Sequence, residues 1–147
     1  MRAVLGVVAS LVVATTGCGL GGHGVGDSQT LDGVVYTLRD ADCTRLPARG
    51  DEPASQTCTV GVTVRNEDEA DGYAFGPRES AVWSGDDHVR SAGNTFADGS
   101  SDVGVDLGET REAVVTLTVP PDFDVEQVGF GQRDTEQVRF DVPDVYR

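Results

Sequence analysis

The chain alternates apolar and polar residues with a period of two over much of its length, a pattern typical of β-strands with one buried face. Two stretches show it best, CTVGVTVRN from Cys58 and EAVVTLTVP from Glu112. Their apolar sides are Cys58, Val60, Val62 and Val64 in the first and Ala113, Val115, Leu117 and Val119 in the second. A polar turn follows Asn66, and Pro120 with Pro121 stops the second strand.

Weaker alternation marks five further runs, which are GVVYTLRD, YAFGPRESAVWSG, DHVRSAG, VEQVGFGQ and EQVRFDV. In the first of them Val34, Tyr36 and Leu38 would point inward. Trp83 alternates with Ala81, which favours burial in the core over a role as a platform on which a ligand stacks. About seven short strands with turns at regular intervals predict an all-β fold, an antiparallel immunoglobulin-like β-sandwich.

The N-terminal residues 1–17 have the character of a signal peptide. Arg2 precedes the apolar run AVLGVVASLVVA, which has the length of a signal-peptide core and is too short to span a bilayer. The following TTGC resembles the lipobox of bacterial lipoproteins, with Gly17 and Cys18 at its last two positions. The resemblance implies that Cys18 is the lipidated first residue of the mature chain, with ordinary secretion as the alternative.

Residues 18–30 are rich in glycine and lack periodicity, so we expect a flexible tether there. Residues 31–147 then form one domain, which is large enough to bury a core. The predicted location is the outer face of the cell membrane, with the lipid as the membrane contact.

Cys43 and Cys58 lie in the exported part of the chain, where disulfides form by default. With Cys18 lipidated they are the only two thiols left to pair, so we expect a disulfide between them that closes a long hairpin loop. A zinc site would need further ligands, and only His23 and His88 are present. Zinc is therefore disfavoured, and we expect no metal or other cofactor.

The formal net charge of −14, from 25 acidic and 11 basic residues, disfavours nucleic acid as a partner. Acidic residues gather in two stretches between the predicted strands, NEDEADG and DGSSDVGVD. Both are candidate binding loops at one end of the sandwich, and their acids are Glu67, Asp68, Glu69, Asp71, Asp98, Asp102 and Asp106. Solvated turns are the simpler interpretation, and weak calcium binding is the other, although the EF-hand spacing fails.

Nothing in the sequence singles out a catalytic site. His88 lies beside Asp86 and Asp87, but neighbours on a strand point to opposite faces, and no serine lies in a G-x-S-x-G turn. We therefore expect a protein that is not an enzyme.

Three segments in order, VVYTLRDADC, then CTVGVTVRNEDEADGYAFGPRESAVWSGD, then LGETREAVVTLTVPPDFDVEQVGF, resemble the telokin-like domain of secreted and lipid-anchored Gram-positive, actinobacterial proteins. That family is related to the mycobacterial immunoprotective extracellular antigen. The matching features are the strand that ends at Asn66 and the strand that LGET introduces from Leu107. The resemblance implies a β-sandwich, often an extracellular accessory or binding module, and it brings no catalytic residues.

Two functions remain open after these considerations. The first is a membrane-anchored binding module whose acidic loops meet a basic protein or a cell-wall partner. The second is a structural or accessory envelope lipoprotein without a dedicated ligand.

Overall fold

The computed structural model describes residues 22–68, 72–90, 94–133 and 136–143. Its strands are β1 (Ser28–Leu31), β2 (Val34–Leu46), β3 (Ser55–Asn66), β4 (Tyr73–Phe75), β5 (Ser80–Ser84), β6 (Asp87–Val89), β7 (Thr95–Phe96), β8 (Val103–Val105), β9 (Thr110–Val119), β10 (Gln127–Arg133) and β11 (Glu136–Asp141). A short 3-10 helix, η1 (Pro77–Glu79), joins β4 to β5. The described part contains no α-helix, so the all-β class is confirmed.

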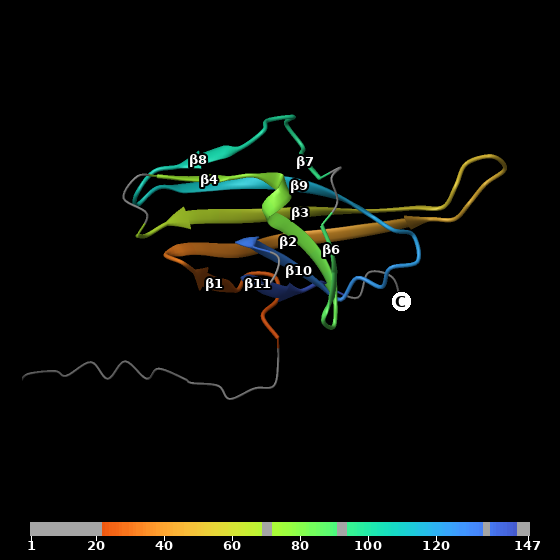
Figure 1. The fold of residues 1–147 in the computed structure, drawn as a ribbon, viewed down its shortest axis with the longest axis horizontal. Coiled ribbons are helices and arrows are strands. Elements are labelled where there is room, and N and C mark those ends of the chain that lie inside the picture. The colour runs from red at the N-terminus through yellow and green to blue at the C-terminus, as the bar shows by residue number, and fades with distance from the viewer. Residues whose placement is uncertain (1–21, 69–71, 91–93, 134–135, 144–147) are drawn as a thin grey trace, which may run out of the picture.

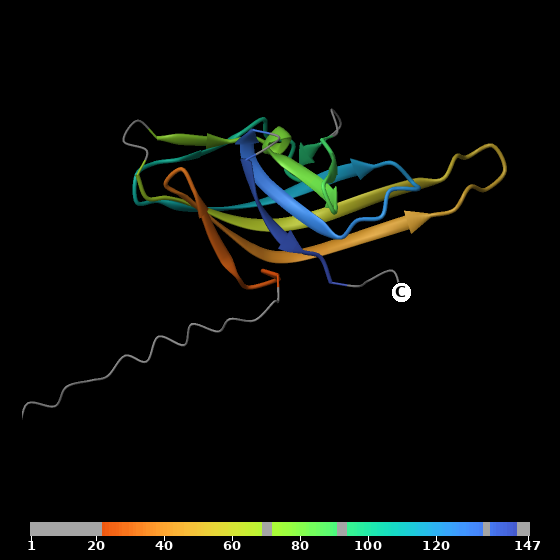
Figure 2. The ribbon, with the colours of Figure 1, turned by 60° about the horizontal axis from the view of Figure 1, so that its bottom comes forward.

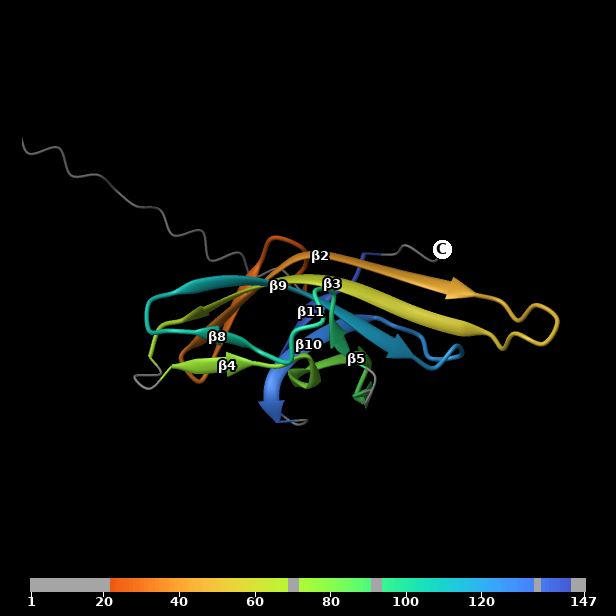
Figure 3. The same cartoon turned by 90° about the horizontal axis from the view of Figure 1, so that it is seen from above.

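The strands form two facing sheets and a separate pair, and every pairing between these strands is antiparallel. The first sheet has the order β1-β2-β3-β9-β7, the second has the order β11-β10-β5-β6, and β4 pairs with β8. Figures 1 and 3 show β2, β3 and β9 running side by side along the long axis of the molecule. The second sheet crosses them obliquely, as Figure 2 shows, and the predicted antiparallel sandwich is thereby confirmed.

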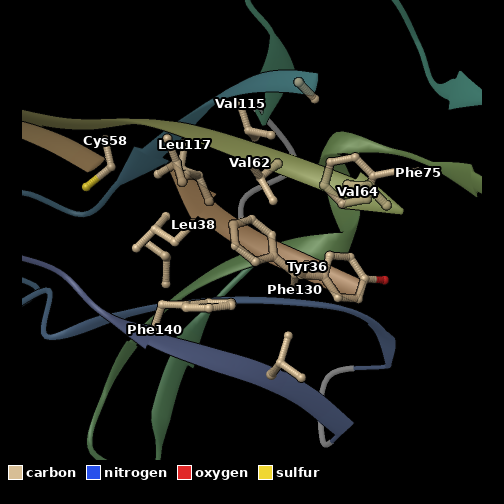
Figure 4. Close-up of a cluster of buried hydrophobic side chains, with 14 of the residues drawn as sticks. Tyr36, Leu38, Cys58, Val62, Val64, Phe75, Val115, Leu117, Phe130 and Phe140 are labelled. Atoms are coloured by element: carbon tan, nitrogen blue, oxygen red, sulfur yellow. The ribbon is translucent and has the colours of Figure 1, made fainter. Parts of the chain in front are cut away.

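The core lies between the two sheets and includes the residues of β2, β3 and β9 whose alternation predicted an inward face. Leu38, Val62 and Val115 are fully buried on the first sheet. Phe130 and Phe140 face them from the second sheet, as Figure 4 shows. Tyr36 of β2 stacks on Phe130 of β10 with ring centroids 5.8 Å apart, which joins the two sheets.

The long β2–β3 hairpin is the most extended feature of the fold, and its tip, residues 47–54, projects beyond the second sheet (Figures 1 and 3). A bulge near Asp40 bends it, and the Asp40 carboxylate accepts a hydrogen bond from the Gly61 amide at 3.1 Å. A Cβ at Gly61 would lie 2.6 Å from the Asp40 Oδ2 atom, so a larger residue there would displace the Asp40 carboxylate from its hydrogen bond.

The structure joins Cys43 and Cys58 in a disulfide, the pairing that the sequence predicted. The two residues are direct partners across the ladder, which continues beyond them to Leu46 and Ser55. The disulfide therefore lies within the ladder of the hairpin and not at the start of its loop. Beyond the disulfide, the Arg45 side chain also donates to that of its strand partner Gln56 at 3.1 Å.

The ordered fold begins earlier than the predicted tether allows. β1 includes Ser28–Thr30, which the expected tether of residues 18–30 contained, and it pairs with β2 through an Asp32-Gly33 turn. Both turn residues have positive φ, as a type I′ hairpin turn requires. Alternation does not predict this edge strand, because Leu31 is the only large apolar residue of β1. Residues 1–17 and Cys18 lie outside the described residues.

Candidate functional site

Three turns meet at the end of the sandwich opposite the β2–β3 tip. They are the β1–β2 turn, the start of the β3–β4 connection and the β8–β9 turn, all on the left of Figure 1. Acidic residues occupy all three. We call Asp32, Glu67, Asp68, Asp106 and Glu109 the acidic end.

Buried Asn66 holds these turns together. Its side-chain amide donates to the Val105 carbonyl at 3.0 Å, and its own carbonyl accepts from the Gly108 amide at 2.7 Å. The Glu67 amide also donates to the Gly33 carbonyl at 2.8 Å, which ties the β3–β4 connection to the β1–β2 turn. These backbone contacts place acids from distant parts of the sequence on one surface.

Arginine neutralises part of the acidic end. Arg65 lies 3.5 Å from Glu67, and Arg111 lies 2.7 Å from Glu109. All four side chains are substantially exposed, so these ion pairs add little stability. Among the residues that the structure describes, Asp32, Asp68 and Asp106 are the acids of this surface that form no ion pair.

The structure divides the second predicted acidic loop, Asp98 to Asp106, into two parts. Strand β8 interrupts it, so Asp106 joins the acidic end while Asp98 and Asp102 stay at the opposite end of β8. The expectation that both acidic stretches lie together at one end is wrong for these two residues. Ser100 donates its backbone and side-chain hydrogens to the Asp98 carboxylate, which lowers the pKa of Asp98. Glu69 and Asp71 lie outside the described residues.

A pocket opens beside the acidic end, between the β1–β2 turn, the start of β4, the end of β10 and the start of β11. We call it the tyrosine pocket, and its volume is about 550 Å³. Its lining residues are Leu31, Asp32, Val34, Tyr36, Tyr73, Gln132 and Glu136. These seven residues include two acids and two tyrosines.

A buried chain of polar groups lies behind the pocket. The Tyr36 and Tyr73 hydroxyls are 2.8 Å apart, and the Tyr73 hydroxyl donates to the Glu79 carboxylate. Burial raises the pKa of Tyr36 to about 12, and burial likewise raises the pKa of Tyr73 and of Glu79. The hydrogen bonds that Glu79 accepts from Tyr73 and Gly76, together with the charge of nearby Arg90, partly offset the rise in the pKa of Glu79. Both phenols therefore stay protonated well above neutral pH.

The sequence analysis assigned Tyr36 to the inner face and missed this polar chain. A buried tyrosine hydroxyl needs a partner, which was the only available signal, and alternation does not say which residue provides it. Tyr73 and Glu79 reach Tyr36 only because β4 and η1 fold over the start of β2.

Trp83 is buried, but it lies outside the core between the sheets. Only 3% of it is exposed, and it faces away from the core that Val82 enters. His88 stacks on the ring with centroids 4.4 Å apart, and the Arg139 guanidinium lies 3.5 Å from the ring centre. The indole N–H donates to Gln137 at 2.9 Å. His88 thus packs against an aromatic ring.

Within the described residues, no group of three His, Cys, Asp or Glu side chains is arranged to hold a metal ion. The same part of the chain contains no helix with the length and apolar character that a membrane crossing demands.

Comparisons of the chain with protein-family models, with curated proteins and with solved structures find no match.

Proposed function

We propose that the protein is a lipid-anchored extracytoplasmic binding module whose acidic end captures a basic partner at the cell envelope. The observation that carries this proposal is the convergence of acids from three turns beside a polar pocket. Loops on a rigid sandwich are common binding surfaces, and a charged surface steers an oppositely charged partner. The relationship to the telokin-like domain belongs to the same proposal, because it implies an extracellular accessory or binding role.

Anchoring depends on Cys18, because acylation requires its thiol. Replacing Cys18 with Ala should abolish incorporation of a labelled fatty acid and release the protein from the membrane fraction or leave its precursor unprocessed. Cys43→Ala is the matched control and should retain the label. Label in the membrane-bound Cys18→Ala protein would contradict the lipid anchor.

Capture by the acidic end should weaken as salt rises, because exposed charges are screened beyond about 8 to 10 Å at physiological ionic strength. The mature protein is immobilised and exposed to envelope extract at low and at high salt. A variant with Asp32→Asn, Asp68→Asn and Asp106→Asn should lose the retained partner at low salt. A control with Asp98→Asn and Asp102→Asn changes acids outside the acidic end and should keep the partner.

Equal retention by both variants would contradict binding at the acidic end. Retention of no partner at low salt would favour the accessory role without a dedicated ligand.

A further inference from the structure

The tip of the β2–β3 hairpin carries the tripeptide Arg49-Gly50-Asp51, in which a guanidinium and a carboxylate flank one glycine. Every residue from Leu46 to Pro53 is exposed. Within the described part of the chain, neither Arg49 nor Asp51 forms an ion pair. Both charged groups are therefore available to a partner.

A tight turn displays these two charges. Arg49 and Glu52 exchange two backbone hydrogen bonds, each at 3.0 Å, so Gly50 and Asp51 are the central residues of the turn. Gly50 has a φ of 57°, whereas Asp51 is not among the residues with positive φ, as in a type II′ turn. A residue with a Cβ rarely adopts such a φ, so the turn depends on the glycine between the two charges.

Two features stiffen the hairpin that carries this turn. The Cys43–Cys58 disulfide joins its two strands. Pro47 and Pro53 flank the turn, and the ring of each proline fixes its φ. A loop that is already held in one conformation loses less entropy when it binds, so this tip is a better ligand than a flexible segment of the same sequence.

The tip lies at the end of the sandwich opposite the acidic end. Figures 1 and 3 show residues 47–54 projecting beyond the second sheet along the long axis. A long projecting loop can insert into a concave surface of a partner. The shape of the tip therefore suits a partner with a recess.

We propose that the Arg49-Gly50-Asp51 tip inserts into a receptor that holds a divalent cation beside an acidic pocket. Carboxylate oxygens are ligands of Mg²⁺ and Ca²⁺, so Asp51 would complete the coordination of the receptor's cation. A guanidinium pairs with carboxylates through two parallel hydrogen bonds, so Arg49 would occupy the acidic pocket. One partner meets both groups, because a single glycine separates them. This inference goes beyond the proposed function, since it assigns a second partner to the opposite end of the domain.

The test uses the mature chain in a nonionic detergent. The probe is the immobilised ectodomain of an integrin, a receptor that binds Arg-Gly-Asp peptides through a divalent cation. Binding should be saturable in Mg²⁺ and should disappear when EDTA removes the cation. A short soluble peptide with the sequence Arg-Gly-Asp should displace the protein, and the matched peptide with Arg-Gly-Glu should not.

Three variants locate the site. Asp51→Glu keeps the charge but moves the carboxylate by one methylene, so binding should weaken by more than about tenfold, in the range for hydrogen bonds to a charged group. Gly50→Ala disfavours the positive φ and should weaken binding severalfold. Glu52→Gln removes the neighbouring acid, retains the backbone hydrogen bonds to Arg49, and should leave the affinity unchanged.

No saturable binding, binding that survives EDTA, or an affinity that neither Asp51→Glu nor Gly50→Ala changes would overturn the inference. The variant with Asp32→Asn, Asp68→Asn and Asp106→Asn should bind the probe as the parent does, because these residues lie at the acidic end. Loss of probe binding in that variant would overturn the inference and assign the binding to the acidic end.

Discussion

Replacing Cys43 and Cys58 together with Ala should lower the free energy of unfolding by about 3 kcal/mol, the chain-entropy estimate for a loop of this size. The bond closes a sequence separation of 15 residues, and without it the unfolded chain gains conformational freedom. Single domains unfold with about 5 to 15 kcal/mol, so the loss is a large fraction of the total. Urea denaturation of the parent and the double variant measures it.

Thiol titration provides the control for this prediction. In a Cys18→Ala background the denatured, unreduced parent should give no free thiol. Recovery of thiols before reduction, or a stability change below about 1 kcal/mol, would contradict a stabilising disulfide.

Raising the pH from about 9 to about 11 should lower the free energy of unfolding by about 2 to 3 kcal/mol through Tyr36 and Tyr73 together. Burial raises the pKa of both above the ordinary tyrosine value of 10.0, to about 12 for Tyr36. Above pH 10 the folded state thus holds protons that the unfolded state has lost. The contribution is complete below pH 10 and is lost as the pH rises toward 12.

The composition makes this measurement specific, because the chain contains no lysine and its 11 basic residues are all arginine. Tyr36→Phe removes one of the two buried phenols and should reduce the alkaline loss by about half. Urea denaturation at several pH values gives the stability, and phenolate absorbance of the folded protein follows ionisation. If the stability did not depend on pH over this range, or if the tyrosines of the folded protein ionised at their ordinary pKa, the buried hydrogen bonds of Tyr36 and Tyr73 would be contradicted.

The strands that the sequence predicts best are those with one face in the core. Val62 and Val115 alternate with polar residues because one side of the first sheet packs on Phe130 and the other side meets water. The same reasoning predicts the break at Pro77, where a 3-10 turn separates β4 from β5. Period and turn chemistry are local properties, so a single sequence contains them.

The features of the fold that the sequence does not predict depend on contacts between distant segments. β7 and β8 contain two and three residues, too few for a period, and they form only because β9 and β4 offer them edges. Trp83 follows the alternation, yet alternation does not reveal which side of the second sheet is the core. The acidic stretches are visible in the sequence, but their grouping depends on how β8 divides the second one.

The contact between the Asp141 amide and the His23 carbonyl, at 2.6 Å, brings the first and last described segments together. The two ends of the described chain therefore lie next to each other in space. A chain reconnected there and opened instead in the exposed tip of residues 47–54 would keep every strand beside its present neighbours. Circular permutation of this kind would change the order in which the strands are synthesised without changing the sheets that they form.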